Sequence, residues 1–203
     1  IGGGVASADF NNDGLEDLFF TSGTAENKLY INKGDFVFED VTSSSGIKKM
    51  NGFDMGVSIA DVNSDGYIDI YICRGGWYQE DDPFVNLLYI NNGDLTFTES
   101  ASDHGLNAAN RSISSVFFDY ENDGDLDLFV ANNPNISSNS RSLADLEEVQ
   151  KDPGTLLLRG SDKLYENNGE GYFTDISIRA GILPDIGFGL NPQVGDLNND
   201  GWL

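Results

Sequence analysis

Residues 9–17 read Asp-Phe-Asn-Asn-Asp-Gly-Leu-Glu-Asp, and the same pattern returns at 61–69, 119–127 and 196–203. We call these stretches windows 1 to 4 and number their positions 1 to 9. Side chains with oxygen atoms stand at positions 1, 3, 5 and 9, and Gly stands at position 6; window 4 stops short of position 9. Alternate residues of a tight loop can point their oxygens at one centre, and Gly permits the sharp turn. The pattern therefore predicts a cation-binding loop.

The predicted cation is Ca²⁺, because flexible loops with only oxygen ligands suit Ca²⁺ better than Zn²⁺ or Mg²⁺. The first half of each window has EF-hand spacing, but the Glu at position 12 is absent and strand-like residues follow. A metal-free, Asx-rich turn is the alternative, and four copies at matching places favour metal. The predicted ligands are the side chains at positions 1, 3, 5 and 9 and the backbone oxygen at position 7: Asp9, Asn11, Asp13, Leu15, Asp17; Asp61, Asn63, Asp65, Tyr67, Asp69; Asp119, Glu121, Asp123, Asp125, Asp127; Asp196, Asn198, Asp200 and Trp202.

The role of one predicted ligand, in window 3, stays open. Glu121 stands where the other windows have Asn, and its extra methylene leaves two alternatives: direct ligation, or a displaced carboxylate with a water in between. Each window lies in its own repeat, so the sites are expected to bind independently.

Charge and composition exclude several classes of protein. The chain has 203 residues and a net charge of −23, and 14 of its 34 acidic residues lie in the windows. Repulsion from phosphate disfavours a nucleic-acid partner, and no apolar run reaches the length of a membrane span. With 39% apolar residues the chain can bury a core. Both ends fall inside a repeat, so we expect a piece of a longer chain or of an envelope complex.

The single cysteine and the single histidine offer little chemistry. Cys73 lies in an apolar run and is expected to be a buried strand thiol, which leaves no disulfide within the chain. His104 lies in a polar turn and is expected to be simply solvated. A histidine-based zinc site or a Ser-His-Asp triad built from this segment alone is not expected.

Three landmarks recur with the windows: Leu-Tyr followed by Asn, an aromatic strand, and Gly followed by Ile or Leu. The Leu of Leu-Tyr and that Gly are 17 residues apart in every copy. Only the interval between the last Asp of a window and Leu-Tyr varies, at 12, 19 and 37 residues. The repeats span about 1–52, 53–110, 111–187 and the truncated 188–203, with an insert at 133–162.

Each repeat is expected to form four short strands. The first enters the window (5–9, 55–61, 112–119), the second leaves it (17–21, 68–73, 126–131), and the third carries Leu-Tyr. A tight turn leads to the fourth, aromatic strand (36–38, 95–97, 172–174), which is a hairpin signal. Four short strands per repeat predict an all-β fold, a segment of a β-propeller with about three four-stranded antiparallel blades and the start of a fourth. A solenoid is the alternative.

Alternating connections place the windows and the hairpin turns on one face. The variable connections and the Gly-Ile/Leu segments are expected on the other face, where binding would reside. The second copy offers Trp77 and Tyr78 there, for stacking on a sugar or anchoring a protein, or for local packing. The insert 133–162 includes a possible short helix at 143–149, or is a disordered surface segment.

The stretch Gly-Val-Ala-x-Ala-Asp-Phe-Asn-Asn-Asp-Gly-x-x-Asp at 4–17, followed by Leu-Tyr-x-Asn and Phe-x-Asp-Val-Thr with Gly-Ile, resembles the FG-GAP/VCBS repeat. The likeness extends to the ASPIC/UnbV and cartilage acidic protein group, and to the calcium loops of integrin α-subunits. It covers nearly all of the chain outside the insert. It implies a propeller, commonly seven-bladed, on a secreted or cell-surface protein, and it assigns no reaction.

The expected function is a calcium-binding, non-catalytic module that presents a protein- or glycan-binding face, secreted or on the cell surface, for instance at a bacterial outer membrane. One alternative is a propeller-type carbohydrate-active enzyme, a lyase or hydrolase. Its acids would have to come from the variable face, such as 80–82 or 147–148, where adjacent acids are normally solvated. A structural subunit of a cell-envelope assembly is the other alternative.

Overall fold

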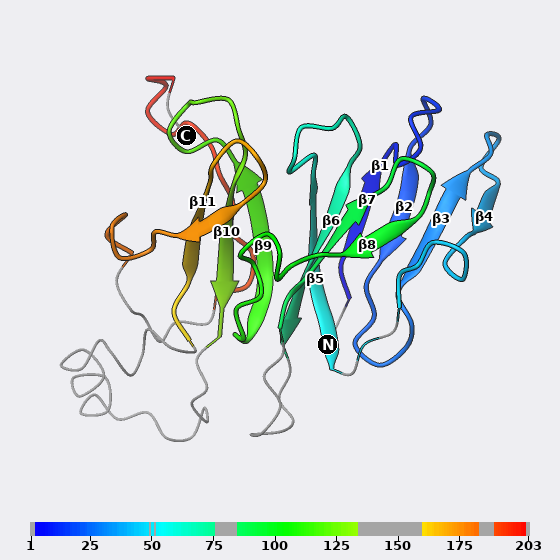
Figure 1. The fold of residues 1–203 in the computed structure, drawn as a ribbon, viewed down its shortest axis with the longest axis horizontal. Coiled ribbons are helices and arrows are strands. Elements are labelled where there is room, and N and C mark those ends of the chain that lie inside the picture. The colour runs from blue at the N-terminus through cyan, green and yellow to red at the C-terminus, as the bar shows by residue number, and fades with distance from the viewer. Residues whose placement is uncertain are drawn as a thin grey trace.

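The computed structural model describes residues 3–48, 50, 52–75, 85–133, 160–182 and 189–201. These residues form three antiparallel sheets of four strands each, without a helix in the described ranges (Figure 1). The strands are β1 Val5–Ala8, β2 Asp17–Phe20, β3 Lys28–Asn32, β4 Phe38–Asp40, β5 Phe53–Ala60, β6 Asp69–Gly75, β7 Leu87–Asn91, β8 Phe97–Glu99, β9 Ser112–Phe118, β10 Asp127–Asn132, β11 Lys163–Asn167 and β12 Phe173–Asp175. The expected all-β class and the four-strand repeats are confirmed.

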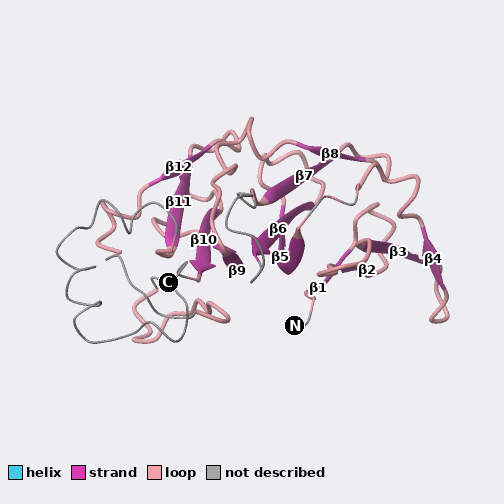
Figure 2. Cartoon of the chain, turned by 90° about the horizontal axis from the view of Figure 1, so that it is seen from below, coloured by secondary structure: helices cyan, strands magenta, loops and turns pink. Residues whose placement is uncertain are grey.

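Each sheet is a simple meander in chain order, β1-β2-β3-β4, β5-β6-β7-β8 and β9-β10-β11-β12. The three sheets, here called blades 1 to 3, lie side by side in an open arc, with β4, β8 and β12 along its outer side (Figure 2). On the inner side β5 contacts both β1 and β9. This arrangement is that of propeller blades rather than of a solenoid.

Apolar side chains fill the two spaces between the blades. The first cluster joins Phe10, Phe19, Leu29 and Ile31 of blade 1 to residues of blade 2 such as Ile70, and the second joins blade 2 to blade 3 in the same manner. Burial of these faces is the main driving force for stacking one blade on the next.

The inner strands approach closely at Gly56. A Cβ at this position would lie 2.6 Å from the carbonyl oxygen of Ile113 in β9, too close for any other residue. Gly56 falls in the irregular part of β5, where the register shifts between Asp54 and Val57. Glycine is therefore needed here because two backbones meet, not because the chain turns.

The fourth strand of each blade begins later than its sequence indicated. The structure starts these strands at Phe38, Phe97 and Phe173. Phe36 and Leu95 belong instead to the hairpin turns, with φ of 59° and 66°. The first turn is closed by the N–H of Lys33, which donates to the carbonyl of Val37 at 2.8 Å. The aromatic and aliphatic side chains of Phe36 and Leu95 are typical of strands, but the closure of the hairpin turn sets their backbone conformation.

The Gly-Ile/Leu segments, here called glycine turns, were expected on the same face as the variable connections. The structure places them on the face of the windows instead. The carbonyl of Ser45, beside Gly46, accepts from the N–H of Phe97 at 2.7 Å. Phe97 pairs with Asn91 next to the β7–β8 hairpin, on the window side. These turns therefore dock blade 1 against the hairpin of blade 2, and blade 2 against that of blade 3.

His104 belongs to such a docking turn, so the expectation that it is merely solvated is wrong. Its Nδ1 lies 2.5 Å from the carbonyl oxygen of Gly171, and its own carbonyl accepts from Phe173 N–H at 2.9 Å. Cys73 is a buried strand thiol, as expected, and burial raises its pKa to about 12.

Several expectations lie outside the described residues: the helix at 143–149, nearly all of the insert 133–162, the aromatics Trp77 and Tyr78, and Trp202. Among the residues that are described, none forms a helix long and apolar enough for a membrane crossing.

Candidate metal centres

All four windows share the same left-handed positions. Position 4 has a positive φ in every copy: Asn12 (57°), Ser64 (59°), Asn122 (58°) and Asn199 (59°). The Gly at position 6 has one as well: Gly14 (87°), Gly66 (88°), Gly124 (98°) and Gly201 (89°). A Cβ at any of these glycines would meet no atom within 4 Å. The glycine is thus required by its φ alone, and short polar residues tolerate φ > 0 at position 4.

The carboxylate at position 1 holds the turn together. In window 1, Asp9 accepts from the N–H of Asp13 at 3.0 Å and from that of Gly14 at 2.7 Å. The same pair of bonds recurs at Asp61, Asp119 and Asp196. These backbone donors orient the carboxylate, and each oxygen keeps a further lone pair for another ligand.

The carboxylate at position 9 ties each of windows 1 to 3 to the third strand of its own blade. Asp17 is fully buried and accepts from Phe10 N–H at 3.0 Å and from Asn32 N–H at 2.8 Å. Asp69 and Asp127 make the equivalent pairs of bonds. Burial raises the pKa of Asp17, and it raises that of Asp69 to about 6 against the opposing backbone bonds. Their charged forms are therefore costly unless a cation is near.

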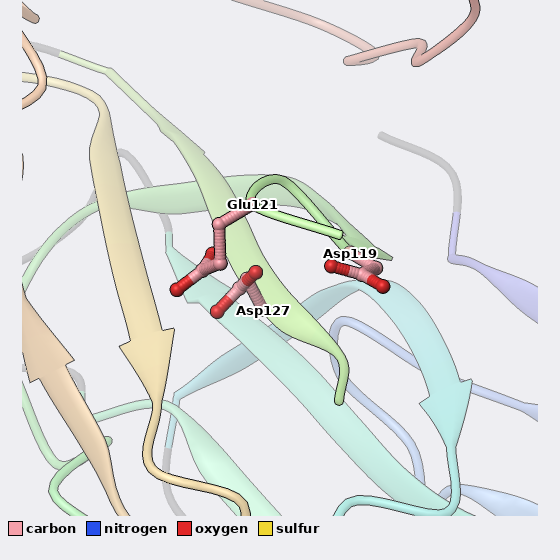
Figure 3. Close-up of side chains that lie close together, drawn as sticks. All are labelled: Asp119, Glu121 and Asp127. Carbon is pink, nitrogen blue, oxygen red and sulfur yellow. The ribbon is translucent and has the colours of Figure 1, made fainter. Parts of the chain in front are cut away.

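Window 3 concentrates the negative charge. Oxygens of Asp119, Glu121 and Asp127 lie within 4.8 Å of one another (Figure 3). Burial first, and then Asp127 and Asp123, raise the pKa of Glu121 to about 7. The Glu121 carboxylate lies beside that of Asp127, inside the cluster rather than turned away from it (Figure 3).

Two oxygens of window 3 are buried without a hydrogen-bond partner among the described residues, Oε2 of Glu121 and Oδ1 of Asp125. Burial, followed by the neighbouring Asp123 and Asp127, raises the pKa of Asp125 to about 6. Buried polar atoms are normally paired. Orphaned carboxylate oxygens among like charges are the donor set that a hard cation satisfies, so these residues fit Ca²⁺.

Windows 1 and 2 carry Asn at position 3, so positions 1, 3 and 9 supply two carboxylates and one amide. Asn11 accepts from Asp13 N–H at 3.1 Å and donates to Asp13 Oδ2 at 3.0 Å. Asn63 repeats this arrangement with Asp65, and Asn198 with Asp200 in window 4. Ligation by these residues and by the carbonyls of position 7 stays a prediction.

At the opposite end of each blade, sequence reasoning missed a second set of side-chain bonds. Asn27 accepts from Ser22 N–H at 2.9 Å and donates to Asp54 of blade 2 at 2.8 Å. Asn86 likewise accepts from Arg74 N–H and donates to Ser112 of blade 3. Both stand two residues before a Leu-Tyr landmark, so their constant spacing was the available signal.

The model of the FG-GAP-like repeat matches residues 9–72 and 77–130, more than half of the chain. The chain belongs to the FG-GAP-like repeat family. The matched ranges include windows 1, 2 and 3 entirely, so the loops described above are part of the repeat that defines this family.

Cartilage acidic protein 1 is among the relatives of this FG-GAP-like chain. The protein of Xenopus tropicalis is 32% identical over 133 residues, which is 64% of the chain and 20% of the relative. The Homo sapiens and Mus musculus proteins are 27% and 26% identical over 70% of the chain and 21% of their own length. The chain thus spans about a fifth of the length of these relatives.

Proposed function

We propose that this FG-GAP-like chain is a calcium-binding, non-catalytic module whose windows fix the corners of its blades. The observation that carries the proposal is window 3, where carboxylates crowd and two buried oxygens have no partner among the described residues. The side chains at positions 1, 3, 5 and 9 would hold the ion, Glu121 included. Bound Ca²⁺ supplies positive charge that offsets the repulsion among these carboxylates.

A non-catalytic role is supported by where the unusual acids lie. Among the described residues, the carboxyls whose pKa is raised all belong to windows: Asp17, Asp69, Glu121 and Asp125. The one histidine is engaged in docking blade 2 on blade 3. The described acids are therefore better explained as a metal-binding set than as a catalytic pair.

We further propose that the protein is secreted or displayed on a cell surface. Extracellular calcium modules typically bind with Kd of about 10⁻⁴–10⁻³ M, so such windows fill outside a cell and stay largely empty in cytosol. Relatives named for cartilage are in keeping with this location.

The proposed partner is a protein or a glycan on the face opposite the windows. Its support is the sequence interval that varies from 12 to 37 residues while the strand register is kept. Deleting 134–160 should leave calcium binding intact and abolish binding on a glycan array or to a captured protein. A deletion variant that unfolds would instead make the insert structural.

Calorimetry on EDTA-stripped protein tests the calcium assignment. We expect calcium binding with millimolar to submillimolar Kd, and loss of one site in Glu121→Ala. Glu39→Ala is the matched control, because Glu39 is an exposed acid of β4. Wild-type protein that binds no calcium would refute the assignment, and an unchanged Glu121→Ala isotherm would remove Glu121 from the ligands.

A further inference from the structure

A buried series of hydrogen bonds connects window 1 to window 2 across the blade interface. Phe10, at position 2 of window 1, donates its N–H to Asp17 at 3.0 Å. The carbonyl of Phe10 accepts from Nδ2 of Asn91 in β7 at 2.9 Å. The backbone N–H of Asn91 donates to Asp69, position 9 of window 2, at 2.8 Å. Each of these four residues is at most 1% exposed.

The same series recurs between windows 2 and 3. Val62 donates its N–H to Asp69 at 3.0 Å, and its carbonyl accepts from Nδ2 of Asn167 at 3.2 Å. The N–H of Asn167 donates to Asp127 at 2.9 Å. The position-9 carboxylates of three windows thus lie on one continuous path through the two interfaces.

Packing and further hydrogen bonds restrict the positions of the residues along this path. Phe10 packs edge-on against Phe97 of blade 2, with ring centroids 6.1 Å apart. Asn91 is also held at its other end, where its Oδ1 accepts from Gly93 N–H at 3.0 Å. A displacement of either residue must therefore be shared by both blades, because buried groups cannot lose these bonds without cost.

We propose that Asn91 and Asn167 couple neighbouring windows, so that calcium in one window raises the affinity of the window beside it. This inference rests on the proposed calcium function. A position-9 carboxylate that calcium holds in place also fixes the N–H of the asparagine bonded to it. The asparagine then holds position 2 of the preceding window, whose N–H orients that window's own position-9 carboxylate. A window that is already ordered pays less entropy on binding, which is positive coupling without a change of fold.

Asn32 provides a matched control within the chain. It stands at the same position of blade 1, accepts from Gly34 N–H at 2.9 Å and bonds Asp17 through its own N–H. Its Nδ2 donates to Glu16 in its own blade rather than to another blade. Asn86 is the complementary control, since it bonds across an interface at the opposite end of the blade without touching a window.

Each window has its own reporter for the experiment. The N–H groups of Gly14, Gly66 and Gly124 donate to the position-1 carboxylates at 2.7, 2.8 and 3.0 Å. Their amide signals in ¹⁵N NMR should therefore follow calcium binding window by window. Asp65→Ala weakens window 2 through a side chain that has no bond to Asn91.

We expect Asp65→Ala to raise the calcium concentration for half-saturation at Gly14 by about fivefold, the effect of one net hydrogen bond. In an Asn91→Ala background the same change should leave Gly14 unaffected. The coupling should persist in Asn32→Ala and in Asn86→Ala. If Asn91→Ala does not fold, the second copy of the path is tested with Asn167→Ala. Asp65→Ala, whose effect on window 2 is followed at Gly66, should then change the calcium titration at Gly124 only while Asn167 is present.

Two results overturn the proposal. Calcium titrations at Gly14 that are the same with and without Asp65→Ala would show independent windows, and coupling that survives Asn91→Ala would assign it to another contact. The bond from Asn12 to the Gly66 carbonyl, 3.1 Å long and exposed, is the alternative route. Glycine signals that never respond to calcium would refute the calcium assignment itself, and the coupling with it.

Discussion

Arg74→Met should remove the countercharge of a buried acid between blades 1 and 2. Nε of Arg74 lies 2.9 Å from Oδ1 of Asp54, and their side chains are 5% and 0% exposed. The remaining side-chain partner of Asp54 is the Asn27 amide at 2.8 Å. Breaking a buried pair from one side typically costs about 3–5 kcal/mol, because the other charge stays buried and unpaired. For a chain of this size that lowers the melting temperature by roughly 10 °C.

The measurement is urea unfolding in saturating calcium, followed by circular dichroism. Lys28→Met is the control, because Lys28 pairs with Asp40 at 3.1 Å with side chains 37% and 41% exposed. Such exposed pairs contribute at most about 1 kcal/mol. Adding Asp54→Leu to Arg74→Met should restore most of the loss. The reasoning fails if Arg74→Met costs no more than Lys28→Met, or if the second substitution makes the loss larger.

Three further predictions concern single turns and pH. Gly105→Ala should lower the melting temperature far more than Gly34→Ala, since both have positive φ but only the Gly105 Cβ meets a backbone oxygen, that of Phe173, at 2.3 Å. Phe36→Gly should raise the unfolding free energy by roughly 0.5–1 kcal/mol, because Phe36 is 96% exposed at φ 59° and loses no packing; a destabilised variant would indicate packing for Phe36. In EDTA, the free energy of unfolding should fall as the pH rises from 4.5 to 7.5. A carboxyl whose pKa is higher in the folded than in the unfolded state, such as Glu121 at about 7, stabilises the fold only while it is protonated. Calcium should reverse most of this loss, and thermal melts at each pH, with and without calcium, measure it.

The sequence alone was sufficient for the repeat and for the local shape of its loops. Oxygen-bearing residues at fixed spacing around a Gly have few possible backbone conformations, so positions 4 and 6 are left-handed in all four windows. Short apolar segments next to these turns then form strands, and a constant interval of 17 residues keeps the third and fourth strands of each repeat alike. These properties depend on residues close together in the chain, so a single sequence is enough to predict them.

Other features depended on which residues meet across an interface. Phe10 and Asn91 are 81 residues apart, and Asn27 and Asp54 belong to different blades. Each Asn looks like an ordinary turn residue in the sequence. Its second partner exists only once the apolar faces of two blades have stacked and set the distance between them.

The same reason explains the corrected expectations. His104 is polar and lies in a turn, so its sequence indicates solvent, yet stacking brings it 2.5 Å from the Gly171 carbonyl of the next blade. Phe36 and Leu95 have strand-forming side chains, but the hairpin closure places both at positive φ. Spacing along the chain determined where the windows form, and packing between blades decided which windows are connected, because hydrogen bonds over long sequence separations are selected by the tertiary fold.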